Sequence, residues 1–136
     1  MFEIGLSNRP EIILHDCAAD RIETKGNKLI MYFGSGIYVR NGGDYELKKG
    51  RLIAECDLLD NEISSCMSAC VFRKNKRSEI SVEELFSSIN EHGLRVYVDF
   101  YSDFASALLI KGYLNDCETE ITVSDIKKLY VMCDRS

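Results

Sequence analysis

The sequence predicts an α+β fold that is mostly β: an antiparallel sheet or sandwich of about seven to nine short strands with one helix at about 81–92. Three observations support this prediction. Apolar and polar residues alternate with a period of two through most of the chain, turn-forming residues separate these stretches, and one segment has helical periodicity. Strands do not alternate with helices, which argues against Rossmann-type and barrel-type α/β folds. We expect one domain, residues 1–136.

The N-terminal third of the chain predicts a hairpin over residues 18–33. Residues 25–27 (KGN) separate two alternating segments, and Gly and Asn adopt the positive φ angles that a tight turn requires. The segment "GSG" at 34–36 is expected to break or bend the second strand before extended structure resumes. The polar segment "NGGDYELKKG", residues 41–50, then predicts a loop.

The middle of the chain contains one clear strand and one ambiguous segment. Residues 52–58 alternate between apolar and polar side chains, as a strand with one solvent-facing side does. In residues 59–73 the apolar positions fit either a helical stripe or a strand face. We favour extended structure over Met67–Arg73, because Val71 and Phe72 prefer strands and the preceding serines weaken a helix.

One segment, residues 81–92, has the features of an amphipathic helix. Ser81 and Glu84 form an S-x-x-E capping box, and Gly93 supplies a left-handed C-cap. His92 is interpreted as a helix-end histidine, because a cation in the last turn favours the helix dipole. An apolar face at helical spacing is expected to pack on the sheet. That face consists of Val82, Leu85, Phe86 and Ile89.

Four strands are predicted after the helix. Residues 94–101 and 106–114 form a hairpin, and residues 118–125 and 126–133 form two further strands. In residues 94–101, strict alternation would direct one set of side chains to the core and the other set to the opposite face. The core set is Leu94, Val96, Val98 and Phe100, and the opposite set is Arg95, Tyr97, Asp99 and Tyr101.

The opposite face of this strand is the predicted partner-binding site. Tyrosines beside carboxylates are typical of interaction surfaces, because the ring is large and apolar while the hydroxyl is polar. The predicted binding residues are Tyr97, Asp99, Tyr101 and Asp103. The alternative is that a second sheet buries these tyrosines. The acidic run Asp116–Glu120 fits a basic partner or calcium, and equally a solvated strand edge that discourages aggregation.

The net charge of −5 argues against an extended phosphate-binding surface. The one basic cluster, residues 73–77 (RKNKR), is interpreted as a solvated loop before the helix. Nucleic-acid binding remains an alternative, and it would use Arg73, Lys74, Lys76 and Arg77. The glycine-rich segments are not followed by a helical pattern, so they do not predict a phosphate-binding loop.

The six cysteines are expected to be reduced and mostly buried, because no basic and apolar leader directs the chain to an oxidising compartment. No stretch approaches the roughly 18 apolar residues of a membrane span. We therefore expect a cytoplasmic protein without a membrane anchor, and we predict no cofactor.

The segment "ILHDCAAD", residues 13–20, combines an imidazole, a carboxylate and a thiol. If it is extended, His15 and Cys17 point the same way, and with Cys66 and Cys70 they form an alternative metal site. A thiol enzyme using His15 and Cys17 is the related alternative. Against both, the chain has no C-x-x-C pair, and in a strand the His15 ring lies roughly 6–7 Å from the thiol. We expect Cys17 to pack inside and His15 to be a buried hydrogen-bonding anchor.

Four motifs occur in order along the chain: "LHDC", "EISVEELFSSIN", "VYVDFYSDFASALLIKGYL" and "DCETEITVSDI". This order resembles small proteins of Gram-positive bacteria and their phages for which no activity is established, and the similarity spans most of the chain. The resemblance implies a bacterial or phage setting and assigns no functional residue. The net acidity, the lack of a catalytic constellation and the polar faces that carry aromatics lead us to expect a non-enzymatic protein-interaction module of the immunity or phage-accessory kind. Its acidity fits a basic protein partner, and a homo-oligomer is compatible with the same features.

Overall fold

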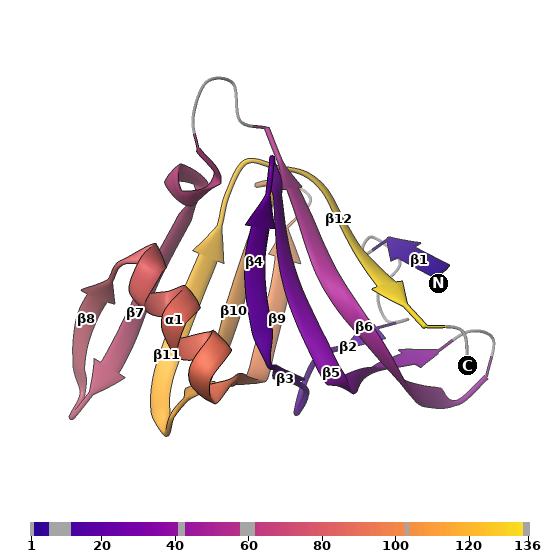
Figure 1. Cartoon of the computed structure of the whole chain (residues 1–136), viewed down its shortest axis with the longest axis horizontal. Coiled ribbons are helices and arrows are strands. Elements are labelled where there is room, and N and C mark those ends of the chain that lie inside the picture. Colours follow the sequence, from indigo (N-terminus) through magenta and orange to yellow (C-terminus); the bar gives the residue numbers. More distant parts are fainter. Residues whose placement is uncertain (1, 6–11, 41–42, 58–61, 103, 135–136) are drawn as a thin grey trace.

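The computed structural model describes residues 2–5, 12–40, 43–57, 62–102 and 104–134. In this part of the chain, twelve strands form two six-stranded antiparallel sheets, accompanied by one α-helix (Figure 1). The two sheets approach each other at one end of the molecule and diverge toward the other. The mostly β, antiparallel architecture with one helix confirms the predicted fold class.

The first sheet, sheet A, contains both the N-terminal and the C-terminal strands. Its order is β1 (Phe2–Gly5), β12 (Ile126–Cys133), β6 (Tyr45–Cys56), β5 (Lys28–Arg40) and β2 (Ile12–Ile13), and β4 (Arg21–Lys25) also pairs with β5. The strand β5 is long and changes register between Phe33 and Ile37. This irregularity lies at the predicted "GSG" bend, where Gly36 has a φ angle of 114°.

The second sheet, sheet B, is built mainly from the C-terminal half of the chain. Its order is β3 (Ala18–Ala19), β9 (Leu94–Ser102), β10 (Ala107–Leu114), β11 (Cys117–Val123), β7 (Met67–Arg73) and β8 (Lys76–Ile80). The strand β7 begins at Met67, as the sequence predicts, directly after a short 3₁₀ helix, η2 (Ile63–Cys66). The chain passes between the sheets through short connections from β3 to β4 and from β11 to β12.

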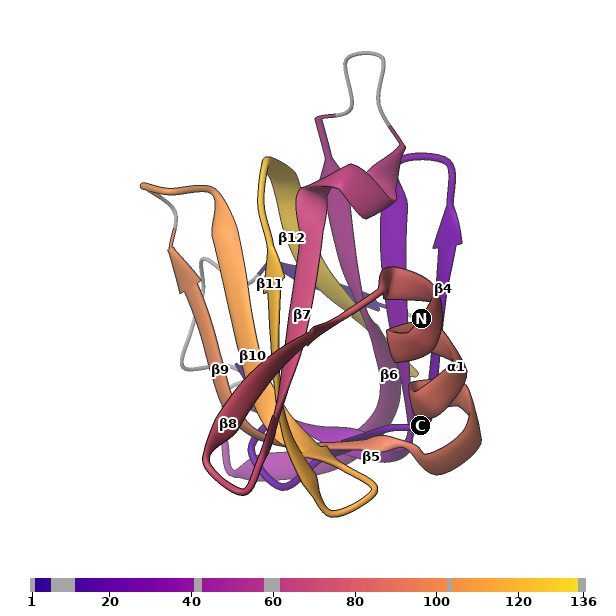
Figure 2. The same cartoon turned by 90° about the vertical axis from the view of Figure 1, so that its left-hand side faces the viewer.

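The helix α1 (Val82–His92) covers the open side between the sheets, where it contacts β4, β7 and β10 (Figures 1 and 2). The predicted cap is present, because the Glu84 N–H donates to the Ser81 hydroxyl oxygen at 3.1 Å. The helix ends at His92, before Gly93, as predicted. The Asn90 side-chain amide accepts from the Ile22 N–H at 2.8 Å and donates to the Ile22 carbonyl at 3.2 Å. It thus pairs with the backbone groups at the edge of β4 that a neighbouring strand would otherwise bind.

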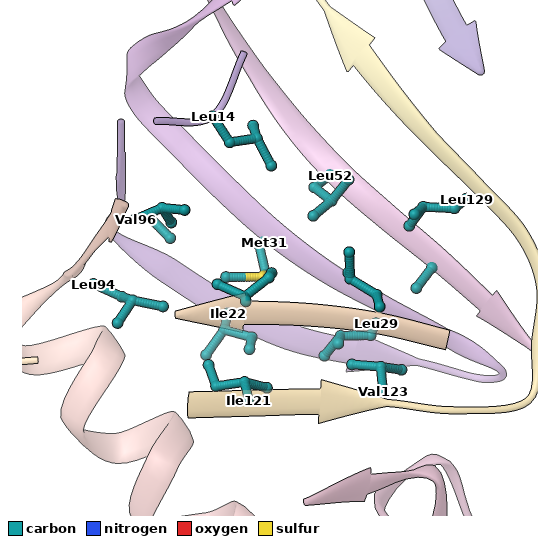
Figure 3. Close-up of a cluster of buried hydrophobic side chains, with 14 of the residues drawn as sticks. Leu14, Ile22, Leu29, Met31, Leu52, Leu94, Val96, Ile121, Val123 and Leu129 are labelled. Carbon is teal, nitrogen blue, oxygen red and sulfur yellow. The ribbon is translucent and has the colours of Figure 1, made fainter. Parts of the chain in front are cut away.

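The hydrophobic core lies between the inner faces of the two sheets (Figure 3). Leu29 and Met31 from β5 point toward Ile121 and Val123 from β11, and the side chain of Leu94 from β9 joins them. Side chains that face the core alternate with outward-facing side chains along each strand, so the period of two in the sequence predicted most of the core residues. In the described part of the chain, no helix has the length and apolar character needed to cross a membrane.

Two predicted loops are partly strand. Tyr45–Cys56 forms the single strand β6, so the loop predicted over residues 41–50 is wrong from Tyr45 onward. The polar side chains of β6 are tolerated because one face of this strand is exposed. The basic segment predicted as a loop forms the tip and return strand of the β7–β8 hairpin. Lys74 and Asn75 have φ angles of 52° and 64°, which fit a two-residue hairpin turn.

Candidate functional site

A β-bulge in β9 determines how sheet B presents its surface. Val96 pairs with Gly112 and Val98 pairs with the preceding residue of β10, Lys111, so Tyr97 is an extra residue in β9. Gly112 permits the close approach of the two strands at this point. A Cβ atom on Gly112 would lie 2.4 Å from the Arg95 carbonyl oxygen, which is too close for any side chain.

The bulge reverses the two faces of β9 beyond Val96. Leu94 and Val96 are fully buried, as the alternation predicts. After Tyr97, however, Asp99 pairs with the buried Ile110, so Asp99 lies on the inner face of the sheet. Phe100 is directed outward and its exposed fraction is 60%. The prediction that Phe100 packs in the core is therefore wrong, because one inserted residue moves every later side chain to the other face.

The predicted partner-binding residues are divided by the same bulge. Tyr97 lies on the outer face, whereas Asp99 and Tyr101 lie on the inner face, and Tyr101 packs against the core. Asp103 lies outside the described residues. Tyr97 and Tyr101 therefore lie on opposite faces of sheet B. The predicted set assumed strict alternation along β9, and the bulge interrupts that alternation.

His15 contacts the bulge from the neighbouring segment of the chain. Its Nδ1 lies 2.7 Å from the Tyr97 carbonyl oxygen, and since that oxygen can only accept, Nδ1 carries the proton. The chain turns here: Asp16 has a φ angle of 66°, and the Cys17 N–H donates to the Leu14 carbonyl at 2.9 Å. The expected extended segment is therefore wrong, and the turn leaves His15 exposed while Cys17 is buried.

Charged and aromatic side chains surround the bulge on the outer surface. The Asp16 carboxylate lies 3.4 Å from His15 Nε2 and 3.5 Å from Arg95 Nη2. The Tyr97 hydroxyl donates to Glu118 Oε1, and this hydrogen bond, together with partial burial and the carboxylate charge, raises the pKa of Tyr97 to about 12. The Tyr97 and Tyr113 ring centroids are 5.2 Å apart. The Tyr97 side chain is thus held both by the hydrogen bond to Glu118 and by its contact with the Tyr113 ring, and these two residues are paired across β10 and β11.

Apolar and aromatic side chains continue from this pair along the outer surface of sheet B, which faces the viewer in Figure 2. Tyr113 has an exposed fraction of 48%, and Phe104, in the β9–β10 connection, is fully exposed. At the other end, the β10–β11 turn and the start of β11 provide the exposed carboxylates of Asp116 and Glu118. We call this surface the aromatic face. It consists of Tyr97, Val98, Phe100, Leu109 and Tyr113, and the exposed Phe104 lies in the connection between the two strands.

The structure separates the residues of the alternative metal and thiol sites. Cys17 donates to the Ile13 carbonyl, and burial raises the pKa of its thiol, which is the opposite of the shift that activates a nucleophile. Cys66 lies beside Asp125, and Cys70 accepts a hydrogen bond from Arg77 Nε at 3.2 Å. Among the residues that the structure describes, no three His, Cys, Asp or Glu side chains are arranged to hold a metal ion.

The basic residues of the alternative nucleic-acid site lie at the tip of one hairpin. Arg73 pairs with Lys76 across the turn, and Lys74 is in the turn itself. Arg77 is directed toward Cys70 on the outer side of sheet B. All four side chains are exposed, as the sequence suggests, but they extend from one hairpin end. Arg73 and Arg77 border two different pockets, and carboxylates line each of these pockets, which does not favour a phosphate backbone.

Sequence reasoning placed Tyr97 in the candidate surface, but it did not place Phe100, Leu109 or Tyr113 there. Tyr113 was assigned to a nearly continuous apolar strand, and Phe100 was assigned to the core. The available signal was Gly112, a glycine within a strand, which often marks a bulge. No protein-family model matches the sequence, and no curated protein or solved structure is significantly similar to it.

Proposed function

We propose that this chain is a non-enzymatic protein-interaction module whose aromatic face binds another protein. The observation that carries this proposal is the exposure of Phe100 by the bulge in β9. A regular strand would have buried this ring, and burying a Phe side chain stabilises a protein by roughly 1.5–3 kcal/mol. The exposed Phe100 ring does not contribute this stabilisation to the fold, and Phe104 and Tyr113 are exposed as well. Exposed large apolar side chains of this kind are typical of a protein interface.

The outer surface of sheet A provides a comparison within the same molecule. Its central apolar residues, Ile30, Ile53 and Tyr130, are buried although, among the described residues, sheet B packs on the opposite face of sheet A. The Arg21 guanidinium lies 4.1 Å from the Tyr32 ring centroid and the Lys128 ammonium 4.5 Å from that of Tyr130, so the chain covers this surface with its own cations. Sheet A exposes Leu47 and, to a smaller extent, Tyr38, whereas sheet B exposes the rings of Phe100 and Tyr113 and adds Phe104 in the adjoining connection, which favours sheet B as the binding surface.

The charges around the aromatic face indicate the chemistry of the partner. Asp116 and Glu118 lie at one end of the face, and Glu120 lies beside Lys111 in the next row of the sheet. Such an acidic border fits a partner that offers an apolar depression bordered by lysine or arginine. A basic partner of this kind is compatible with an immunity or phage-accessory role.

The experiment is affinity capture from cells of the organism that encodes the chain, with matched surface variants. A Phe100→Ser/Tyr113→Ser variant removes the two most open rings that lie within the sheet, and Leu47→Ser removes an equally exposed apolar residue of sheet A, whose exposed fraction is 54%. We expect one stoichiometric partner with the unmodified chain and with Leu47→Ser. Its recovery should fall at least about tenfold with the double variant, because hot-spot aromatics contribute 2 kcal/mol or more. Equal recovery with all three proteins would contradict the proposal.

A further inference from the structure

A groove opens on the side of the molecule where β4 and α1 lie next to each other (Figures 1 and 2). Its volume is about 490 Å³, and binding pockets typically measure roughly 300–1,000 Å³. Thr24 from β4 forms one wall, Ile63 from η2 another, and Val82 and Phe86 from the first turns of α1 a third. The residues of the aromatic face do not line it. The groove is therefore a second surface to be explained.

The apolar part of the groove continues the hydrophobic core. Val82 and Phe86 are only partly buried, and they pack against the core cluster to which Ile63 belongs. Thr24 lies two residues after the buried Ile22 in β4, so both side chains are directed to the core-facing side of sheet A, yet Thr24 is exposed. The core is thus open at this point, and an apolar side chain that entered the groove would extend it.

The wall that β4 contributes is the edge of a sheet. Among the described strands, β4 pairs only with β5. The N–H and carbonyl of alternate residues in a strand point to the same side, and Asn90 of α1 binds both groups of Ile22 on the side away from β5. The N–H and carbonyl of Thr24 therefore point to this side as well. Within the described residues, neither group has a hydrogen-bond partner there.

Two carboxylates border the groove. Glu62 lies directly before η2 and Glu83 lies in the first turn of α1, and both side chains are exposed. The described lining of the groove contains no lysine or arginine. The groove thus presents negative charge, apolar side chains and an unpaired strand edge together, and a positively charged partner would complement it.

We propose that this groove binds an extended, basic peptide segment of another protein, which adds a short strand beside β4. The peptide backbone donates to the Thr24 carbonyl and accepts from the Thr24 N–H, as in other cases of strand addition. The peptide residue opposite Thr24 directs its side chain to the core-facing side, where the apolar wall surrounds it. A lysine or arginine two residues along the peptide lies on the same face and meets Glu62 or Glu83.

The shape of the edge sets the position of the added strand. The Asn90 side chain occupies the edge at Ile22, so pairing begins at Thr24 and continues toward the β4–β5 turn. A Cβ atom on Gly26 in that turn would meet no atom within 4 Å, so the space beside it is open. The edge also favours a peptide over a small apolar molecule, which would leave the Thr24 N–H and carbonyl unpaired.

The experiment measures amide hydrogen exchange in the full-length chain by NMR, with synthetic peptides as probes. The capped peptide consists of threonines around a central phenylalanine, with a lysine two residues to either side of it. In one control peptide serine replaces the phenylalanine, and in another glutamates replace the lysines. We expect the basic phenylalanine peptide to slow exchange of the Thr24 N–H at least about tenfold, because a paired amide exchanges only when the pairing opens. The control peptides should leave this rate unchanged.

Two variants of Thr24 isolate the backbone contact. Thr24→Pro removes the N–H that faces the groove and leaves the β4–β5 ladder in place, whereas Thr24→Ala keeps this N–H. We expect the affinity for the peptide, measured by fluorescence anisotropy, to fall at least about tenfold with Thr24→Pro and to change less than about twofold with Thr24→Ala.

Charge variants test the acidic border without changing β4. Glu62→Lys/Glu83→Lys should weaken peptide binding about fivefold, whereas Glu91→Lys, in the last turn of the same helix, should not. The Phe100→Ser/Tyr113→Ser variant of the aromatic face should bind the peptide normally. Failure of this proposal is therefore distinguishable from failure of the proposed function.

Three results would overturn the proposal. The first is an unchanged exchange rate of the Thr24 N–H with the basic phenylalanine peptide at millimolar concentration. The second is protection by this peptide at β8, the edge strand of sheet B, in place of Thr24. The third is binding of toluene in the groove together with no binding of the peptide, which would assign the groove to small apolar molecules. All three are measured on the unmodified chain, so the test does not depend on the folding of a variant.

Discussion

At the level of single residues, the ring of His15 completes the hydrogen bonding of the bulge. The extra residue in β9 leaves the Tyr97 carbonyl without a regular ladder partner, and His15 Nδ1 donates to it at 2.7 Å. The same ring lies 3.4 Å from the Asp16 carboxylate, which is itself 3.5 Å from Arg95. His15 is thus an exposed structural contact between the N-terminal segment and sheet B.

We expect His15→Ala to lower the free energy of unfolding by about 1 kcal/mol, because an intramolecular hydrogen bond contributes about 0.5–1.5 kcal/mol. Thermal or urea unfolding of the variant and the unmodified chain measures this difference. An unchanged melting temperature would show that water satisfies the Tyr97 carbonyl equally well.

Tyr97 gives a second prediction at this scale, in alkaline solution. Its pKa is raised to about 12 from the ordinary value of 10, mainly by the hydrogen bond to Glu118. Between these values the folded chain binds more protons than the unfolded chain, so this tyrosine makes stability fall as the pH rises from about 10 to about 12. An ultraviolet titration of phenolate formation should show a late component that Tyr97→Phe removes and that Glu118→Gln shifts to lower pH. A titration unaltered by Glu118→Gln would contradict the assigned cause.

At the level of elements, the bulge between β9 and β10 controls which side chains reach the surface. The bulge depends on Gly112, since a Cβ atom there would meet the Arg95 carbonyl at 2.4 Å. Gly43 offers a control, because a Cβ atom at that position meets no atom within 4 Å.

We expect Gly112→Ala to destabilise the fold by roughly 1–3 kcal/mol, as overpacking does, and Gly43→Ala to change stability by less than about 0.5 kcal/mol. Denaturant unfolding of both variants measures the difference. Equal stabilities would mean that the two strands separate at no cost, which would contradict the role assigned to Gly112.

Elements with a repeated local signal were predictable from the sequence. The helix has a cap, an apolar stripe and a terminal glycine, and the strand β7 has a run of strand-forming residues; both begin and end within a residue of the prediction. The bulge was not predictable in the same way, because an inserted residue leaves the alternation of β9 looking regular. The turn at His15 depends on Asp16 in a left-handed conformation, which Asp adopts only in particular contexts.

The candidate site was therefore only partly predictable. Tyr97 was found because a tyrosine in an alternating strand is visible in the sequence. Its neighbours come from β10, from β11 and from the segment before β3, and only the pairing of strands brings Tyr113, Glu118 and His15 to it.

At the level of the whole molecule, the two sheets share one core but have different outer surfaces. Sheet A covers Tyr32 and Tyr130 with its own cations and exposes Leu47, whereas sheet B exposes Phe100 and Tyr113. A ring that serves binding and not folding can be replaced at little cost to the fold. We expect Phe100→Ser to change the free energy of unfolding by less than about 0.5 kcal/mol, as measured by denaturant unfolding. A loss of several kcal/mol would assign this ring to the fold.

The most direct test of the proposed function is site-specific photocrosslinking in cells of the organism that encodes this chain. A benzoylphenylalanine placed at position 100 samples the aromatic face, and the same group placed at position 47 samples the outer surface of sheet A, where Leu47 has a comparable exposed fraction. The proposed function predicts one crosslinked partner from position 100 and none from position 47. Crosslinking of the same partner from position 47, with none from position 100, would contradict it.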